Sequence, residues 1–241
     1  MNAYTLVTGG TSGIGFAAAE KLIEEGRQVI ITGQNRARLE AAAEKLGCMG
    51  VVANSGDTDS VRALAKQLRD DNIRLNGLVL NAGVFIPAGF EETTEASYDE
   101  TFAVNTKGPF FTLQALLPCL ENPCAVVFVS TIAVDKGFTG CASYAASKAA
   151  AEAFVRVANI ELAPRGIRIN VLRPGVTATP IQDKAGISDS DKQALFNHME
   201  TMALGRVLTA SDHAGTISYL LSDASIAMRH AVIQVDGGYV L

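Results

Sequence analysis

The chain has 241 residues, of which 20 are Lys or Arg and 25 are Asp or Glu, so its formal net charge at pH 7 is −5. Apolar residues make up 48% of the sequence, which suffices for a sizeable core and excludes disordered and collagen-like classes. The acidic balance argues against a nucleic-acid partner, because proteins that bind phosphate backbones are usually basic. No uncharged apolar run reaches the roughly 18 residues of a membrane span, so we expect no membrane partner.

The N-terminal residues begin directly with a strand-like run at Tyr4, without a basic and apolar leader before it. We therefore expect no secretory signal and a cytoplasmic location. Four cysteines and three histidines are widely spaced, and they form neither a C-x-x-C pair nor a zinc-ligand cluster. The expectation is no metal, and free thiols in a reducing compartment.

Short β-branched runs alternate with longer stretches rich in Ala, Leu, Glu and Lys. The strand-like runs are residues 4–8, 28–32, 49–53, 77–80, 125–129, 167–172 and 232–235. The helical stretches are residues 13–25, 36–46, 58–71, 97–120, 142–162 and 211–221. Most strand runs are apolar throughout, which is typical of strands covered on both faces. This alternation predicts an α/β fold, a doubly wound (Rossmann-type) seven-stranded parallel sheet flanked by helices on both faces, in one domain over residues 1–241.

Residues 180–205 interrupt this alternation, because they contain no strand run and are only loosely amphipathic. Two interpretations stay open for this segment. It is either a pair of surface helices or a mobile lid over a substrate pocket.

Residues 8–15 read Thr-Gly-Gly-Thr-Ser-Gly-Ile-Gly, directly after the first predicted strand and at the start of the first predicted helix. Glycines in this position permit a tight turn and let the backbone approach a pyrophosphate. The helix N-terminus supplies N–H groups and partial positive charge for phosphates. The segment indicates a dinucleotide site, and a plain glycine-rich turn is the alternative.

Residues 144–148 read Tyr-Ala-Ala-Ser-Lys inside the predicted helix 142–162. A spacing of four stacks Tyr144 and Lys148 on one helix face. A free tyrosine has a pKa of roughly 10, and a nearby ammonium is predicted to lower it. The pair would then supply a general acid near neutral pH. This spacing alone is common by chance, and a solvent-exposed helix pair is the alternative.

Two hydroxyl side chains, Ser130 and Thr131, follow the strand-like run 125–129 and precede Tyr144 by 14 and 13 residues. In open α/β sheets, ligands bind where the strands end. A hydroxyl there could hydrogen-bond a substrate carbonyl and the Tyr144 oxygen together.

Several short motifs occur together in one order. They are T-G-x-x-x-G-I-G at 8–15, N-A-G at 81–83, Asn105, the hydroxyls at 130–131, Y-A-A-S-K at 144–148, P-G-x-x-x-T at 174–179 and V-D-G-G at 235–238. Any one could arise by chance, but their joint order and spacing leave little room for chance. The sequence therefore resembles the short-chain dehydrogenase/reductase family over essentially its full length.

The resemblance implies an NAD(P)(H)-dependent oxidoreductase that interconverts a ketone or aldehyde and an alcohol by hydride transfer. In that family the residue matching Tyr144 is the proton donor or acceptor, and the one matching Lys148 lowers the tyrosine pKa and binds the nicotinamide ribose. The residue matching Asn105 holds a water that links the lysine to solvent. The family's catalytic serine lies 13 residues before the tyrosine, where this chain has Thr131. We favour Thr131 as the carbonyl-binding hydroxyl, with Ser130 as the fallback.

The resemblance also assigns residues to the cofactor. Besides Tyr144 and Lys148, the expected cofactor-binding residues are Gly9, Thr11, Ser12, Gly13, Ile14, Gly15, Gln34, Asn35, Arg36, Asn54, Asn81, Ala82, Gly83, Pro174, Gly175, Thr177 and Thr179. Asn54 departs from the family's usual Asp, although its carbonyl can still accept a hydrogen bond from the adenine amino group. His230 also departs from the pattern, because glycine is common there, just before the final strand.

The choice of cofactor depends on the end of the second predicted strand. NAD-preferring relatives carry an acidic residue near the position of Gly33, and none is present. Basic residues that many NADP-preferring relatives carry at the positions of Gln34 or Ser12 are missing too. Arg36 either reaches a 2′-phosphate or faces water at a helix start. We expect NADP(H) to be favoured over NAD(H).

The expected partner is a small carbonyl or alcohol substrate, held under the segment 180–205 against an apolar wall of Val134, Phe138 and Cys141. Such a wall favours a neutral or hydrophobic carbonyl compound, hence a carbonyl reductase. By analogy a homotetramer, or a homodimer, forms through the helices at 97–120 and 153–162, although Phe154, Val157 and Ile160 could equally be core residues. A non-catalytic NAD(P)-binding sensor or scaffold is the alternative function. An enoyl reductase is disfavoured, because that relative spaces its tyrosine and lysine more widely.

Overall fold

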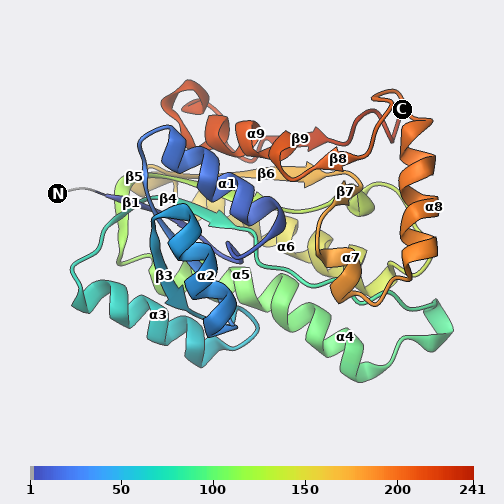
Figure 1. Cartoon of the computed structure of the whole chain (residues 1–241). Helices are drawn as coiled ribbons and strands as arrows, with labels where there is room; N and C mark the ends of the chain where they lie inside the picture. Colours follow the sequence, from blue (N-terminus) through green and yellow to red (C-terminus); the bar gives the residue numbers. More distant parts are fainter. Residues whose placement is uncertain (1–2) are drawn as a thin grey trace.

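A computed structural model describes residues 3–241. Its main sheet contains parallel strands in the order β3-β2-β1-β4-β5-β6-β9 (Figure 1). The strands are β1 Tyr4–Val7, β2 Gln28–Gly33, β3 Met49–Val52, β4 Leu75–Leu80, β5 Leu120–Val129, β6 Ile167–Pro174 and β9 Val232–Val235. The strand order reverses between β1 and β4, and doubly wound sheets bind ligands at such a point. The predicted seven-stranded parallel α/β fold is confirmed.

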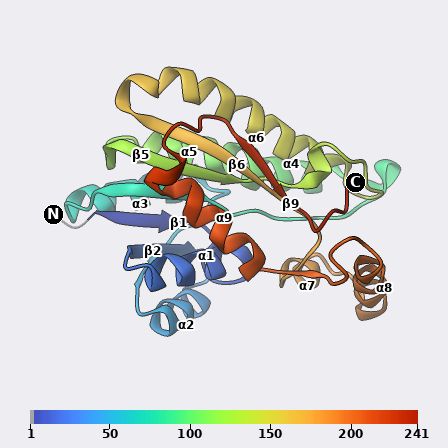
Figure 2. The ribbon, with the colours of Figure 1, turned by 90° about the horizontal axis from the view of Figure 1, so that it is seen from above.

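Helices cover both faces of this sheet. They are α1 Gly13–Glu24, α2 Arg36–Leu46, α3 Thr58–Asp70, α4 Glu95–Phe102, α5 Gly108–Leu116, α6 Ala142–Glu161, α7 Ile181–Lys184, α8 Asp189–Glu200 and α9 Ser211–Leu221. In Figure 2, α1, α2 and α9 lie on one side of the strands and α3, α5 and α6 lie on the other. Within residues 3–241, no helix is both long and apolar enough to cross a bilayer.

The alternation of side chains along each strand supplies two separate cores. Leu78 of β4 packs in the core under α3, α5 and α6, whereas the next residue, Val79, packs under α1, α2 and α9. Val126 and Val127 of β5 divide in the same way. Because successive side chains point to opposite faces, a strand buried on both sides must be apolar at every position.

The predicted helix over 97–120 is wrong in its extent. The structure divides it into α4, a π-helical turn over Ala103–Lys107, and α5, which ends at Leu116. Pro118 cannot continue a helix, because it lacks an amide hydrogen and its ring clashes with the preceding turn. The chain then enters β5 at Leu120, five residues earlier than predicted, since 120–124 includes a charged residue and a proline that hide the strand.

Residues 180–205 form α7 and α8 and contain no strand, as predicted. Short strands β7 (Thr177–Ala178) and β8 (Leu208–Thr209) flank this segment and pair in parallel. This small ladder was not predicted, because two-residue strands carry no recognisable pattern. It ties both ends of the segment together beside the carboxyl ends of the main strands (Figure 1).

Candidate active site

A cavity of about 760 Å³ lies at the carboxyl ends of the parallel strands. Its walls come from the turn after β1, the ends of β2 to β6, helix α6 and the segment 180–205. Most of the residues predicted to bind cofactor or substrate line it. They are Gly9, Thr11, Ser12, Gly13, Ile14, Gln34, Asn54, Asn81, Ala82, Gly83, Thr131, Tyr144, Lys148, Pro174, Gly175, Thr177 and Thr179.

The glycine-rich turn has the backbone conformation that its sequence requires. Gly9 and Gly13 have φ angles of +65° and +57°, which side-chain-bearing residues rarely adopt. Gly15 does not line the cavity; a Cβ there would lie 2.4 Å from Asn81 Nδ2, so its hydrogen permits the close packing of α1. The turn thus presents the N-terminus of α1 to the cavity, where a phosphate fits.

The end of β4 is fastened to this turn by hydrogen bonds. Asn81 Nδ2 donates to the carbonyls of Thr8 and Gly9, over 3.0 and 3.1 Å. Thr8 Oγ1 accepts from the backbone N–H of both Asn81 and Ala82. These bonds therefore hold the turn after β1 and the end of β4 in a fixed position relative to each other.

Tyr144 and Lys148 lie on one face of α6, and both line the cavity. Thr131 lies beside the Tyr144 hydroxyl and acts to lower its pKa. Lys148 Nζ donates to the carbonyl of Val129 over 2.8 Å. The phenol, the ammonium and the strand-end hydroxyl therefore line one cavity together with the glycine-rich turn.

The prediction that the pKa of Tyr144 is lowered is wrong. Burial raises the pKa of Tyr144 to about 12, and Thr131 offsets this only in part. Burial also lowers the pKa of Lys148 to about 8, against the attraction of Glu152. Both groups are desolvated in the same place, so the loss of hydration outweighs the attraction expected from proximity.

Ser130 and Thr131 point in different directions. Thr131 contacts Tyr144, and its Oγ1 also accepts a 3.2 Å hydrogen bond from the Ala133 N–H. Ser130 instead donates to the buried carboxylate of Glu152, which also receives hydrogen bonds from Arg173 Nε and a terminal Arg173 nitrogen. Both residues line the cavity, but the Ser130 hydroxyl is engaged by Glu152, so Thr131 offers the hydroxyl available to a ligand beside Tyr144.

Asn105 lies in the π-helical turn behind the cavity and is fully buried. Its side chain accepts a hydrogen bond from the Val84 N–H and donates to the Val84 carbonyl, both over 2.9 Å, and it donates to Ser147 Oγ over 3.1 Å. These contacts fix the loop after β4 against α6. The Asn105 side chain does not line the cavity.

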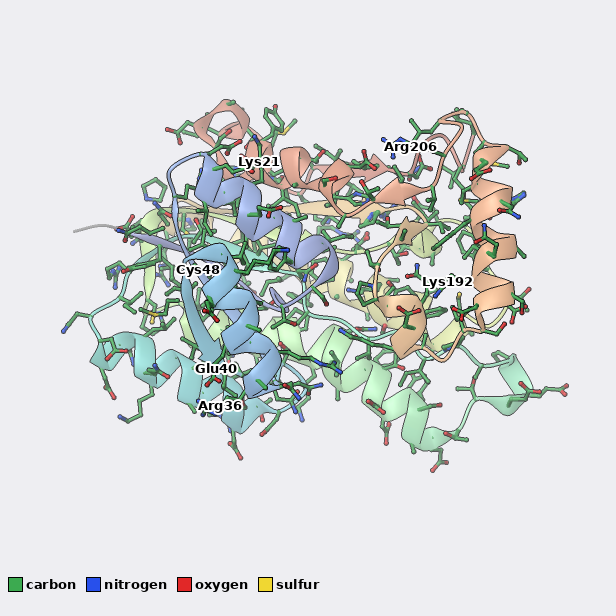
Figure 3. All side chains as sticks on the ribbon, viewed as in Figure 1. Lys21, Arg36, Glu40, Cys48, Lys192 and Arg206 are labelled. Carbon is green, nitrogen blue, oxygen red and sulfur yellow. The ribbon has the colours of Figure 1, made fainter. Side chains whose placement is uncertain are left out.

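Asn35 and Arg36 also lie away from the cavity lining. Asn35 caps α2 by accepting a hydrogen bond from the Arg38 N–H, and Arg36 pairs with Glu40 one turn later over 3.7 Å. Figure 3 shows Arg36 and Glu40 together on the outer end of α2. Of the two interpretations of Arg36, the structure fits a helix-start residue facing water.

The far part of the cavity is apolar, but not everywhere as predicted. Phe138 and Cys141 line it, whereas Val134 does not. The wall gains residues that sequence reasoning missed, namely Phe85, Pro87, Ile181, Ile187 and Leu195. Phe85 packs edge-to-face on the Tyr144 ring, with the ring centroids 5.0 Å apart. No local signal marks these residues, because loops and the segment 180–205 bring them together.

Gln182 is a further residue that the sequence did not reveal. Its Nε2 donates to the Thr177 carbonyl over 2.7 Å, and its Oε1 accepts from the Thr179 N–H over 3.2 Å. It therefore fixes the strand end that carries Thr179 to the start of the segment 180–205.

Comparison with known proteins agrees with this geometry. The sequence profile of a family described as "Enoyl-(Acyl carrier protein) reductase" matches residues 9–240. Human dehydrogenase/reductase SDR family member 2, mitochondrial, is 34% identical over 93% of this chain and 82% of its own length. The 3-oxoacyl-[acyl-carrier-protein] reductase FabG of Staphylococcus aureus is 30% identical over 99% of this chain and 98% of its own.

Two solved structures are similar in fold as well. Levodione reductase superimposes with a TM-score of 0.91 at 26% identity, covering 99% of this chain and 97% of that one. The RhlG/NADP complex of Pseudomonas aeruginosa gives a TM-score of 0.90 at 29% identity, covering 99% and 96%. The chain belongs to the short-chain dehydrogenase/reductase family and is an NAD(P)-dependent oxidoreductase.

Proposed function

We propose that the protein is a carbonyl reductase that uses Tyr144 as its proton donor and takes a neutral or hydrophobic ketone or aldehyde. The observation that carries this proposal is that Tyr144, Thr131 and Lys148 line the same cavity as the glycine-rich turn, with Thr131 beside the Tyr144 hydroxyl. A substrate oxygen beside these two groups would be polarised by both hydroxyls. The apolar wall of Phe85, Phe138 and Leu195 favours an uncharged substrate.

A bound nicotinamide cofactor supplies the hydride in this reaction. The raised pKa of Tyr144 keeps its phenol protonated at neutral pH, so the proton is available for the developing alkoxide. Thr131 holds the carbonyl oxygen at the phenol. Lys148 binds the cofactor ribose and, with the cofactor present, favours the phenolate left after proton transfer. Asn105 positions the loop after β4 and the helix that carries the pair.

The decisive experiment measures reduction of a panel of ketones and aldehydes, with absorbance of the reduced cofactor as the readout. Tyr144→Phe should reduce kcat by at least about a hundredfold, as expected for loss of a general acid, while cofactor binding persists. Thr131→Ala should lower kcat, and Thr131→Ser should restore it, whereas Ser130→Ala serves as the matched control with little change in kcat. Cofactor binding by the wild type without turnover on any compound would favour the alternative, a sensor or scaffold.

We also propose NADP(H) as the favoured cofactor. At the end of β2 the cavity is lined by Gly33 and Gln34, neither of which carries a carboxylate. No negative charge from this strand end therefore repels a 2′-phosphate. The solved relative RhlG binds NADP. A tighter Kd for NADH than for NADPH would overturn this preference.

The oligomeric state that we propose is a homotetramer, or a homodimer, built on α5 and α6. Phe154 packs against the core through Phe128, but Val157 and Ile160 are 52% and 74% exposed on the same helix. Ile160→Glu should therefore yield a smaller species in light scattering.

We also propose a cytoplasmic location, which accords with four unpaired cysteines.

A further inference from the structure

The segment 180–205 carries a lysine that reaches back to the glycine-rich turn. Lys184 ends α7, and its Nζ donates a hydrogen bond to Ser12 Oγ over 3.4 Å, across 172 residues of sequence. The start of the segment packs on the same turn, since a Cβ on Gly13 would lie 3.4 Å from the Thr179 side chain. The Lys184 ammonium therefore lies at the N-terminal end of α1.

This end of α1 is suited to an anion. Ser12 is the N-cap residue, yet its side chain accepts no hydrogen bond from the helix backbone. The first turn of α1 contains no acidic residue. The N–H groups of that turn and the helix dipole both favour negative charge. The Lys184 ammonium adds a further positive charge at the same place, so an anion bound there would be attracted by all three.

Lys184 is free to meet such an anion. Its neighbour Asp183 is engaged by Lys192, whose Nζ lies 2.7 Å away, and Lys184 itself forms no ion pair within residues 3–241. Among the described residues that line the cavity, the cationic ones are Lys148 and Lys184. Lys148 is buried at the Tyr144 end and bonded to the Val129 carbonyl. Among these two, Lys184 is thus the cation available to an anion at the N-terminus of α1.

We propose that Lys184 binds a phosphate of the dinucleotide, so that one side of the phosphate site is supplied by the segment above the cavity. This inference rests on the proposed cofactor site. The chemistry is that of an ammonium and a phosphate oxygen. Two phosphate groups could provide it, namely the diphosphate of either nucleotide and the 2′-phosphate that only NADP(H) carries.

The test compares the Kd of NADPH and NADH, by quenching or enhancement of nucleotide fluorescence, for the wild type and three variants. Lys184→Gln should weaken binding by at least about fivefold, because it removes a charge-assisted hydrogen bond. Lys184→Arg should stay within about twofold of the wild type, because it keeps the charge. Lys66→Gln, an exposed lysine of α3 away from the cavity, is the matched control and should leave both Kd values unchanged.

The pattern of the loss identifies the phosphate. Equal weakening of NADPH and NADH supports the diphosphate, and weakening of NADPH alone supports the 2′-phosphate; in either case the loss should shrink in 0.5 M salt, with a Debye length of roughly 4 Å. Unchanged Kd values in Lys184→Gln, with a wild type that binds normally, would overturn the role of Lys184 and leave the cofactor site intact. A wild type that binds neither nucleotide would instead overturn the proposed function itself.

Discussion

The floor of the cavity and the segment 180–205 above it hold their polar groups in different ways. The floor, formed by the end of β5, helix α6 and the end of β6, buries Lys148 and Glu152, which are 3% and 6% exposed, and supplies hydrogen-bond partners from neighbouring elements. Residues 180–205, which we propose as a lid, are fastened mostly by exposed contacts such as the pairing of Lys192 with Asp183. Figure 3 shows Lys192 on the side of α8 that faces α7.

This difference between floor and lid matches two different requirements, proton transfer in the floor and release of cofactor and product at the lid. Proton transfer needs groups held in one geometry, and the low dielectric of a buried site strengthens each of their interactions. A lid must release cofactor and product, so it is best held by contacts that water can replace. We therefore expect substitutions in the floor to change stability strongly and substitutions in the lid to change it little.

The largest expected effect is in the floor, at the buried ion pair of Arg173 and Glu152. Arg173→Leu removes the ion pair of the buried Glu152 carboxylate and leaves Ser130 as its hydrogen-bond donor within residues 3–241, which should cost about 3–5 kcal/mol of unfolding free energy. Urea unfolding measures it. Arg36→Leu, which removes an exposed pair on α2, is the control and should cost less than about 1 kcal/mol. Equal losses in the two variants would contradict the contrast between buried and exposed charges.

The next effect concerns the base of the lid, where His213 of α9 lies fully buried with its Nε2 2.8 Å from Thr177 Oγ1. Burial lowers its pKa to about 4, from roughly 6.5 in the unfolded chain. Between these values the unfolded chain binds more protons than the folded one, so stability falls as the pH drops from 6.5 to 4. The contribution from His213 is up to about 3 kcal/mol.

Urea unfolding at a series of pH values checks this effect. His213→Gln should flatten the dependence in this window relative to the wild type, whatever its effect on stability at pH 7. An unaltered slope in the variant would mean that other groups carry the acid sensitivity.

The smallest effect is expected in the lid itself. Lys192 pairs with Asp183 and Asp189, but both carboxylates are largely exposed, at 62% and 97%. Exposed ion pairs contribute little, so Lys192→Ala should change Tm by no more than about 2 °C. A thermal melt measures this, and a drop of more than about 5 °C would show that the lid is held as firmly as the floor.

Parts of this molecule follow from short stretches of sequence. The apolar runs predict the strands because each must fill two cores, as Val126 and Val127 do. The spacing of Tyr144 and Lys148 places both on one helix face by helix geometry alone. The glycine-rich turn needs Gly9 and Gly13 at positive φ, so its conformation can be predicted from the residues of the turn themselves. The fold and the centre of the candidate site are therefore predictable from the sequence.

Other features depend on contacts between distant segments. Whether the hydroxyl of Ser130 or that of Thr131 is available to a ligand depends on Glu152, which accepts a hydrogen bond from Ser130. The raised pKa of Tyr144 reflects burial that no spacing reveals.

His230 occupies a left-handed conformation, with φ of +55°, which a glycine would adopt without strain. Lys184 meets Ser12 only because β7 and β8 bring the lid back over the turn. Local periodicity determined the framework and the placement of Tyr144 and Lys148 on one helix face. Hydration, charge and the choice among neighbouring hydroxyls were decided by tertiary packing, because desolvation and long-range hydrogen bonds depend on which segments exclude water together.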